Sequence, residues 1–179
     1  MGTSNSKVNL VDKSGKDNVY ITPSRVIDVV RSYFNSQNLS IELDPATEPN
    51  NPVGAKKFYT ETTNGLLHPW IDGTFVNPPF SQGNMPVWIK KISEEASHGK
   101  HIIALLPCGA RFGTAYWQDY AFISNLKAIC FVRGRVKFLR KDGTVAKSNT
   151  YDSQIYGYNI DIAKFKEYFG KLGKVLCIA

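Results

Sequence analysis

The sequence has few of the residues from which metal sites and disulfide frameworks are built. Its 179 residues include three cysteines and three histidines. These are Cys108, Cys130, Cys177, His68, His98 and His101. An odd number of cysteines without C-x-x-C spacing indicates reduced thiols rather than a disulfide framework. The histidines match no metal-ligand spacing such as HExxH, so we expect no metal site.

Long apolar segments are also absent. No apolar run approaches the ~18 residues that a membrane span requires, and the polar N-terminus lacks the apolar core of a secretory signal. We therefore expect a cytoplasmic protein that does not enter a membrane. Residues 1–19 are polar and show no periodicity, which predicts a flexible N-terminus followed by a single domain over residues 20–179.

Positive charge is present in excess and is concentrated in one segment. The net charge is +7, which favours a polyanionic partner. Segment 133–148, RGRVKFLRKDGTVAKS, contains a single acid, Asp142. Its basic residues are Arg133, Arg135, Lys137, Arg140, Lys141 and Lys147. Two interpretations remain open from the sequence: a solvated hairpin, or an arm that contacts phosphate groups.

Hydrophobic periodicity and turn residues predict alternating helices and strands. We expect helices at 23–37, 86–97, 114–124 and 161–170, and strands at 39–44, 74–76, 101–107, 127–132, 153–160 and 174–179. Thr22 is the expected N-cap of the first helix. A hairpin is expected at 133–147, and the stretch from 45 to 67 shows little periodicity. This order predicts an α/β fold with a largely parallel sheet and an antiparallel C-terminal hairpin.

Two predicted strands end in polar residues. ELDPAT places Asp44 at the end of one strand, and FVNPPF places Asn77 at the end of another. Ligands gather at the carboxyl ends of parallel strands, so both residues are candidates for a binding site. Asp44 fits two roles equally: a partner for a ribose hydroxyl or an ammonium group, or the cap of a turn before Pro45.

Asn77-Pro78-Pro79-Phe80 suits the chemistry of a nucleobase amine. Such an amine is a poor nucleophile because its lone pair is delocalised into the ring. Two rigid acceptors, the Asn77 side-chain oxygen and the Pro78 carbonyl, would accept from its two N–H bonds. Both prolines restrict the backbone, and Phe80 offers a face for base stacking. The alternative is that Asn-Pro-Pro merely ends a strand as a turn.

Several motifs occur in an order that resembles a known family. They are Thr22-Pro23, Asp44-Pro45-Ala46-Thr47, GLLHPW before Asn77-Pro78-Pro79-Phe80, LLP at 105–107 and GRVKF at 134–138. From about Thr22 to Tyr158, the sequence resembles the phage-type DNA adenine-N6 methyltransferases.

The resemblance implies a Rossmann-like methyltransferase fold, S-adenosylmethionine as cofactor, and flipping of the target adenine from double-stranded DNA. It implies a catalytic motif of Asn77, Pro78, Pro79 and Phe80, and a cofactor site that includes Thr22, Pro23, Asp44, Ala46 and Asn77. The phosphate contacts would then come from Arg133, Arg135, Lys137, Arg140 and Lys141. The resemblance also implies an enzyme that is encoded by a phage or prophage and acts in the cytoplasm of a bacterial cell.

The sequence departs from the wider methyltransferase class after Asp44. No G-x-G follows this residue, and the interval to Asn77 is short. One or two cofactor-side strands are therefore expected to be missing, and the pocket for the cofactor adenosine is undefined. Two alternatives stay open: an enzyme for another planar amine, such as RNA adenine, cytosine N4 or glutamine, and a non-catalytic nucleic-acid-binding or anti-restriction module. The sequence leaves the oligomeric state and the target DNA sequence open.

Overall fold

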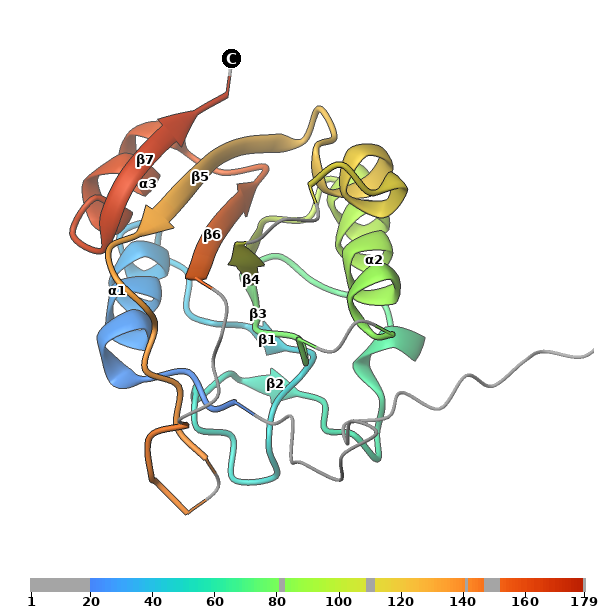
Figure 1. The fold of residues 1–179 in the computed structure, drawn as a ribbon, viewed down its shortest axis with the longest axis vertical. Coiled ribbons are helices and arrows are strands. Elements are labelled where there is room, and N and C mark those ends of the chain that lie inside the picture. The colour runs from blue at the N-terminus through green and yellow to red at the C-terminus, as the bar shows by residue number, and fades with distance from the viewer. Residues whose placement is uncertain (1–19, 81–82, 109–111, 141, 147–151, 179) are drawn as a thin grey trace, which may run out of the picture.

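The chain folds around one seven-stranded sheet with helices on both faces (Figure 1). The computed structural model describes residues 20–178 except 81–82, 109–111, 141 and 147–151. The predicted flexible N-terminus, together with Arg111, Lys141 and Lys147, lies outside these residues. The elements in chain order are α1 (Ser24–Asn35), β1 (Leu43–Asp44), β2 (Lys57–Phe58), the 3-10 helix η1 (Gly65–Leu67), β3 (Thr74–Val76), α2 (Met85–Ser97), β4 (Ile102–Cys108), the π-helix η2 (Trp117–Ala121), β5 (Leu126–Val132), β6 (Asp152–Tyr158), α3 (Ile162–Phe169) and β7 (Gly173–Cys177).

The strands lie in the order β2-β1-β3-β4-β6-β5-β7. The pairs from β2 to β4 are parallel, whereas β6 pairs antiparallel with both β4 and β5, and β7 pairs antiparallel with β5. The α/β class is confirmed. The expectation of a largely parallel sheet holds only for its first half. In the second half the chain enters β6 without a described helix after β5, and a parallel neighbour would need such a crossover.

Helix α1 packs on one face of the sheet through apolar side chains that recur at helical spacing. Its residues Val26, Val30 and Phe34 are fully buried and share a core with Phe75 and with Phe165 of α3. The other face is covered by α2 and η2, in a second core that includes Ile89, Ile92 and Trp117. The apolar run of β4 supplies both cores alternately, because successive side chains of a strand point to opposite faces.

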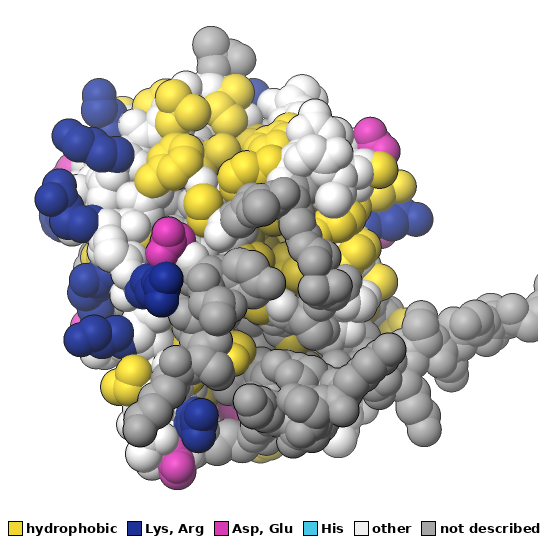
Figure 2. Space-filling model, in the orientation of Figure 1, with side chains coloured by type: hydrophobic (Ala, Val, Ile, Leu, Met, Phe, Trp, Pro, Cys, Tyr) yellow, Lys and Arg dark blue, Asp and Glu magenta, His cyan; other side chains and the backbone are white. Residues whose placement is uncertain are grey.

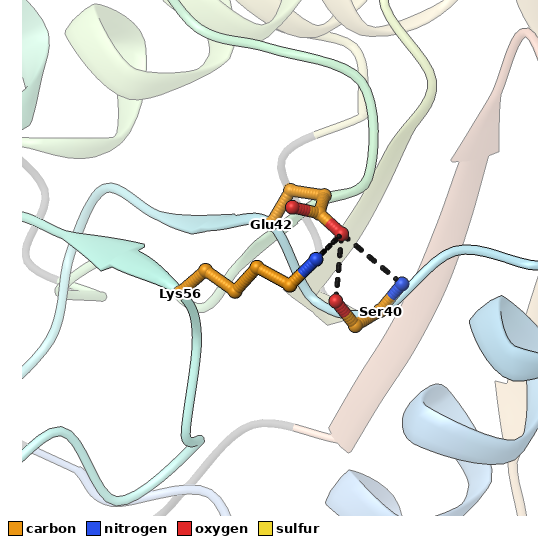
Figure 3. A network of polar contacts seen from close by, with 3 residues as sticks. All are labelled: Ser40, Glu42 and Lys56. Atoms are coloured by element: carbon orange, nitrogen blue, oxygen red, sulfur yellow. Dashed lines mark hydrogen bonds and ion pairs between the residues drawn. The ribbon is translucent and has the colours of Figure 1, made fainter.

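The strand predicted at 39–44 is shorter than expected. Only Leu43 and Asp44 form β1, and the residues before them are held by side-chain contacts (Figure 3). Glu42 Oε1 accepts hydrogen bonds from Ser40 Oγ at 2.6 Å and from Lys56 Nζ at 2.9 Å. These bonds, chiefly those from Ser40, lower the pKa of Glu42. The network joins the segments that lead into β1 and β2.

Three other elements differ from the sequence-based expectations. Strand β2 lies within the stretch that showed little periodicity, and its two residues are exposed, so they carry no hydrophobic pattern. The described residues of the hairpin predicted at 133–147 form a turn and the bridge Leu139–Val145 rather than a pair of strands. The helix predicted at 114–124 is mainly the five-residue η2.

None of the helices in the described part of the chain is long and apolar enough to cross a membrane.

Candidate active site

A cleft lies at the carboxyl ends of β1 and β3, which are adjacent in the sheet. It contains about 740 Å³ of empty space, part of which is open to solvent. Its walls come from residues 20–22, 44–48, 52–53, 60–61, 64–65 and 77–79 and from Trp88. Among the residues predicted for catalysis or cofactor binding, those that line the cleft are Thr22, Asp44, Ala46, Asn77, Pro78 and Pro79. Pro23 and Phe80 lie beside it.

The amide group of Asn77 is held in one orientation. Its Nδ2 donates to the backbone carbonyl of Tyr20 at 2.9 Å and to Thr22 Oγ1 at 3.0 Å. A backbone carbonyl can only accept, so the nitrogen must face Tyr20 and the oxygen must face away. Asn77 Oδ1 is buried and has no hydrogen-bond partner among the described residues. An unpaired buried acceptor is costly, and here it is available to a ligand with an N–H donor.

The rest of the NPPF motif is partly built into the core. Pro78 is buried, and Pro79 is half-buried. Phe80 is also half-buried and contacts both core clusters. Its ring meets that of Phe138 edge-on, with centroids 5.6 Å apart and an interplanar angle of 87°. This contact fixes the direction of the Phe80 ring and leaves part of it accessible.

Thr22 does not cap α1 as the sequence suggests. Pro23 occupies the N-cap position with extended backbone angles and makes no side-chain cap bond. The buried hydroxyl of Thr22 instead accepts from Asn77, so it orients the amide. Pro23 is in the helix start rather than in the cleft wall, and its carbonyl accepts from Val26 N at 2.9 Å.

Asp44 is buried at the floor of the cleft. Its side chain accepts from Ala46 N at 3.0 Å and is only 2% exposed as a residue. Burial raises the pKa of this carboxyl to about 7, while the bonds from Ala46 and Thr47 act in the opposite direction. Removal from water disfavours the charged form of an acid, so the empty cleft favours neutral Asp44. A cationic ligand would restore its charge.

The cleft is acidic within a basic protein. Asp44, Glu48 and Glu61 are among the lining residues, and the lining contains no lysine or arginine within the described part of the chain. Figure 2 shows Lys and Arg side chains gathered along the flank that carries α1, α3 and β7. A phosphate-bearing cofactor would be repelled by such a cleft, whereas a cation would be attracted.

Glu61 and Gly65 are among the cleft residues that sequence reasoning missed. Glu61 follows β2, next to the end of β1, where a carboxylate can meet a ribose hydroxyl. Because both residues of β2 are exposed, they gave no hydrophobic pattern from which this strand could be predicted. Gly65 begins η1 and packs on Pro45: a Cβ at Gly65 would lie 2.1 Å from the Pro45 carbonyl oxygen. No local signal reveals this long-range contact.

The basic segment lies beside the cleft. Arg133, Arg135, Lys137 and Arg140 are exposed, while Val136 and Phe138 between them are buried. The backbone groups of Leu139 and Ile21 exchange hydrogen bonds of 2.8 and 3.0 Å, and Ile21 lines the cleft. In Figure 1 the segment projects from the end of β5 as an orange loop. Four of the five basic residues predicted to contact DNA are thus on one exposed arm, and Lys141 is outside the described residues.

No group of three or more His, Cys, Asp or Glu side chains is placed to hold a metal ion in the described part of the chain.

Comparisons with known proteins identify the family. No curated protein matches the chain. The family model described as DNA N-6-adenine-methyltransferase (Dam) matches residues 9–164, most of the sequence and every element that forms the cleft. The chain therefore belongs to the DNA N-6-adenine-methyltransferase (Dam) family.

Proposed function

We propose that this protein transfers a methyl group from S-adenosylmethionine to N6 of adenine in double-stranded DNA. Family membership implies adenine methylation of DNA in general. The observation that carries the specific proposal is the buried, unpaired Oδ1 of Asn77 at the end of β3. It supports the role expected for NPPF, because this oxygen is positioned by two other bonds and is free to accept from an amine.

The cleft fits the proposed cofactor in charge and in shape. S-adenosylmethionine supplies a methyl group on a positively charged sulfonium and also carries an ammonium group. Asp44 and Glu48 offer negative charge to these cations, and Glu61 is placed for the ribose hydroxyls. Gly65 allows η1 to close on Pro45, so backbone contact replaces the missing G-x-G loop. The strand order, with an antiparallel strand beside the end of the parallel group, is in keeping with a Rossmann-like methyltransferase.

The proposed chemistry rests on orientation. The target adenine leaves the duplex, at a cost of a few kcal/mol, and its ring stacks on Phe80. Asn77 Oδ1 and the Pro78 carbonyl accept from the two N–H bonds of N6 and draw its lone pair out of the ring. As N6 forms its bond to the methyl carbon, the bond between that carbon and the sulfonium sulfur would break, and S-adenosylhomocysteine would leave as a neutral thioether. The positive charge passes to the amine, and the two carbonyl oxygens stabilise it. The surplus proton then leaves N6 for solvent.

The test is transfer of tritiated methyl groups from S-adenosylmethionine to unmethylated DNA, to RNA and to protein. Chromatography of the digested nucleosides then identifies the product. We expect N6-methyladenine in DNA. Asn77→Ala should lower the rate at least about 100-fold, by analogy with the loss of other oriented transition-state contacts. S-adenosylhomocysteine binding, measured by calorimetry, should stay close to that of the wild type.

Asn125→Ala is the matched control. Asn125 is also half-buried and also uses its amide as a donor, to Asn159 Oδ1 at 2.9 Å, but it lies outside the cleft. Near-normal methylation by Asn77→Ala would overturn the catalytic assignment. Tritium found in RNA, in cytosine or in protein would show that the substrate is not adenine in DNA. A folded protein that binds neither S-adenosylmethionine nor S-adenosylhomocysteine would favour a non-catalytic module.

A further inference from the structure

A second buried polar atom in the cleft has no partner. Trp88 lies on α2, is 4% exposed and lines the cleft. Its indole Nε1 is buried and makes no hydrogen bond to any described residue. The indole of Trp70, in the same core, does have a partner, because its Nε1 donates to the carbonyl of Gly65 at 3.0 Å. The third tryptophan, Trp117, lies outside the cleft.

An unpaired buried donor is as unusual as an unpaired acceptor. Buried tryptophan N–H groups normally find an acceptor, since leaving one unpaired forfeits its bond to water. Trp88 and Asn77 line the same cleft, and their unpaired atoms Nε1 and Oδ1 have opposite hydrogen-bonding character and do not bond to each other. A ligand that carries a donor and an acceptor would satisfy both atoms at once.

The surroundings of Trp88 indicate the kind of acceptor. It packs in a core with Leu43, Val76 and Trp70, and the described residues that line the cleft include no lysine or arginine. A carboxylate or phosphate oxygen buried there would lack a compensating charge, which is costly. A neutral heteroaromatic nitrogen carries no such cost.

We propose that the Trp88 indole N–H donates a hydrogen bond to a ring nitrogen of an adenine bound in the cleft. This inference rests on the proposed function. That function brings two adenines to the protein, the target base and that of the cofactor, and each carries ring nitrogens that only accept. Adenine presents an amine beside a ring nitrogen, which is the donor–acceptor edge that Asn77 and Trp88 complement. Trp88 thereby becomes a specificity-determining residue.

Two variants at position 88 test this role. Trp88→Phe removes the N–H and one ring; incorporation of 3-benzothienylalanine at position 88 removes the N–H but keeps the two-ring shape. Trp117→Phe is the matched control, because Trp117 is also buried but lies outside the cleft. Because Nε1 has no partner among the described residues of the ligand-free protein, the benzothienyl variant should melt at the wild-type temperature or above it.

The two sources of adenine are separated by two measurements. Calorimetry with S-adenosylhomocysteine and with its 7-deaza and 1-deaza analogues reports on the cofactor. Methylation of two duplexes of the same sequence, amplified with dATP or with 7-deaza-dATP, and of synthetic duplexes with 1-deazaadenine, reports on the target. We expect both Trp88 variants to lose about tenfold or more in one of these measurements, as for loss of a hydrogen bond with the other partner left unpaired. One deaza analogue should lower the affinity or the methylation rate of the wild type. The same analogue should cause no further loss in the Trp88 variants.

The outcomes are distinct. Wild-type affinity and methylation rates within about twofold in both Trp88 variants would overturn the role of Trp88 and leave the proposed function standing. A loss that is equal for normal and deaza ligands would also overturn it, because the effect would then be on packing. A wild-type protein that binds no S-adenosylhomocysteine and methylates no DNA would overturn the proposed function, and this inference with it.

Discussion

At the scale of single residues, the site depends on polar groups that folding has buried. Asn77 is oriented by Tyr20 and Thr22, which are far from it in sequence, and its oxygen is left unpaired. Asp44 is buried, and the described residues of the cleft wall offer it no basic partner. Both arrangements cost stability in the free protein, and both are relieved by a ligand with N–H donors and positive charge. Such strained polar groups are expected where a protein is built to bind.

The raised pKa of Asp44 predicts a pH dependence. In the folded, ligand-free protein this pKa is about 7, above the ordinary value near 3.9. As pH rises from about 4 to about 7, the unfolded chain loses this proton and the folded chain keeps it, so stability falls with pH. Binding of a cation requires the ionised form. Affinity for S-adenosylhomocysteine should therefore rise roughly tenfold from about pH 6 to about pH 8.

Asp44→Asn is the control for this prediction. It keeps the shape and an acceptor for Ala46 N but cannot ionise. Calorimetry of the variant across the same pH range should give weaker binding that no longer rises with pH. A wild-type affinity that is flat over this range would show that Asp44 does not carry the charge that meets the ligand.

At the scale of elements, the cleft is shaped by the contact of η1 with the turn after β1. Gly65 has room for no side chain, because Pro45 lies against its Cα. Trp70 holds this contact from the other side, through its bond to the Gly65 carbonyl. A 3-10 helix thus packs against the turn after β1, where the wider methyltransferase class has a glycine-rich loop and this sequence has none.

Gly65→Ala should open this contact. A Cβ at 2.1 Å from a backbone oxygen forces the backbone to move, and overpacking of this kind costs about 1–3 kcal/mol. We expect a lower melting temperature and weaker S-adenosylhomocysteine binding. Gly113→Ala, where a Cβ would meet nothing within 4 Å, should leave both unchanged. Normal binding by a folded Gly65→Ala would mean that η1 is not part of the cofactor site.

At the scale of the whole molecule, charge is separated by location. The protein carries a net charge of +7, yet none of the described residues that line the cleft is basic. The arm of Arg133, Arg135, Lys137 and Arg140 is exposed at the cleft's border, joined to it through Leu139 and Ile21. This separation suits a protein that must attract a polyanion to its surface and hold a cation in its interior.

The arm predicts a salt-dependent affinity for DNA. Replacing Lys137 and Arg140 together by Gln should weaken DNA binding and reduce the slope of log K against log salt by about 2, roughly 0.9 for each lost phosphate contact. The charge-matched control replaces Lys166 and Lys174, which are exposed on α3 and on β7 at the far edge of the sheet. Fluorescence anisotropy with duplex DNA at several salt concentrations measures both. Equal slopes in the two double variants would exclude the arm as the DNA contact.

Local sequence determined much of this protein. Val26, Val30 and Phe34 recur at helical spacing and form the buried side of α1, and the apolar run before Cys108 forms β4. Asn-Pro-Pro after a short β-prone stretch correctly located the end of β3, because these residues restrict the backbone whatever surrounds them. The ordered motifs led to the family that the family model confirms.

Only the tertiary structure decided the rest. The exposed β2, the closure of Gly65 on Pro45 and the bridge from Leu139 to Ile21 depend on residues distant in sequence, so no local pattern reveals them. The same holds for Thr22, whose hydroxyl was expected at a helix cap and is instead bonded to Asn77. Chain segments that meet only on folding decide which polar atoms are paired and which are left for a ligand.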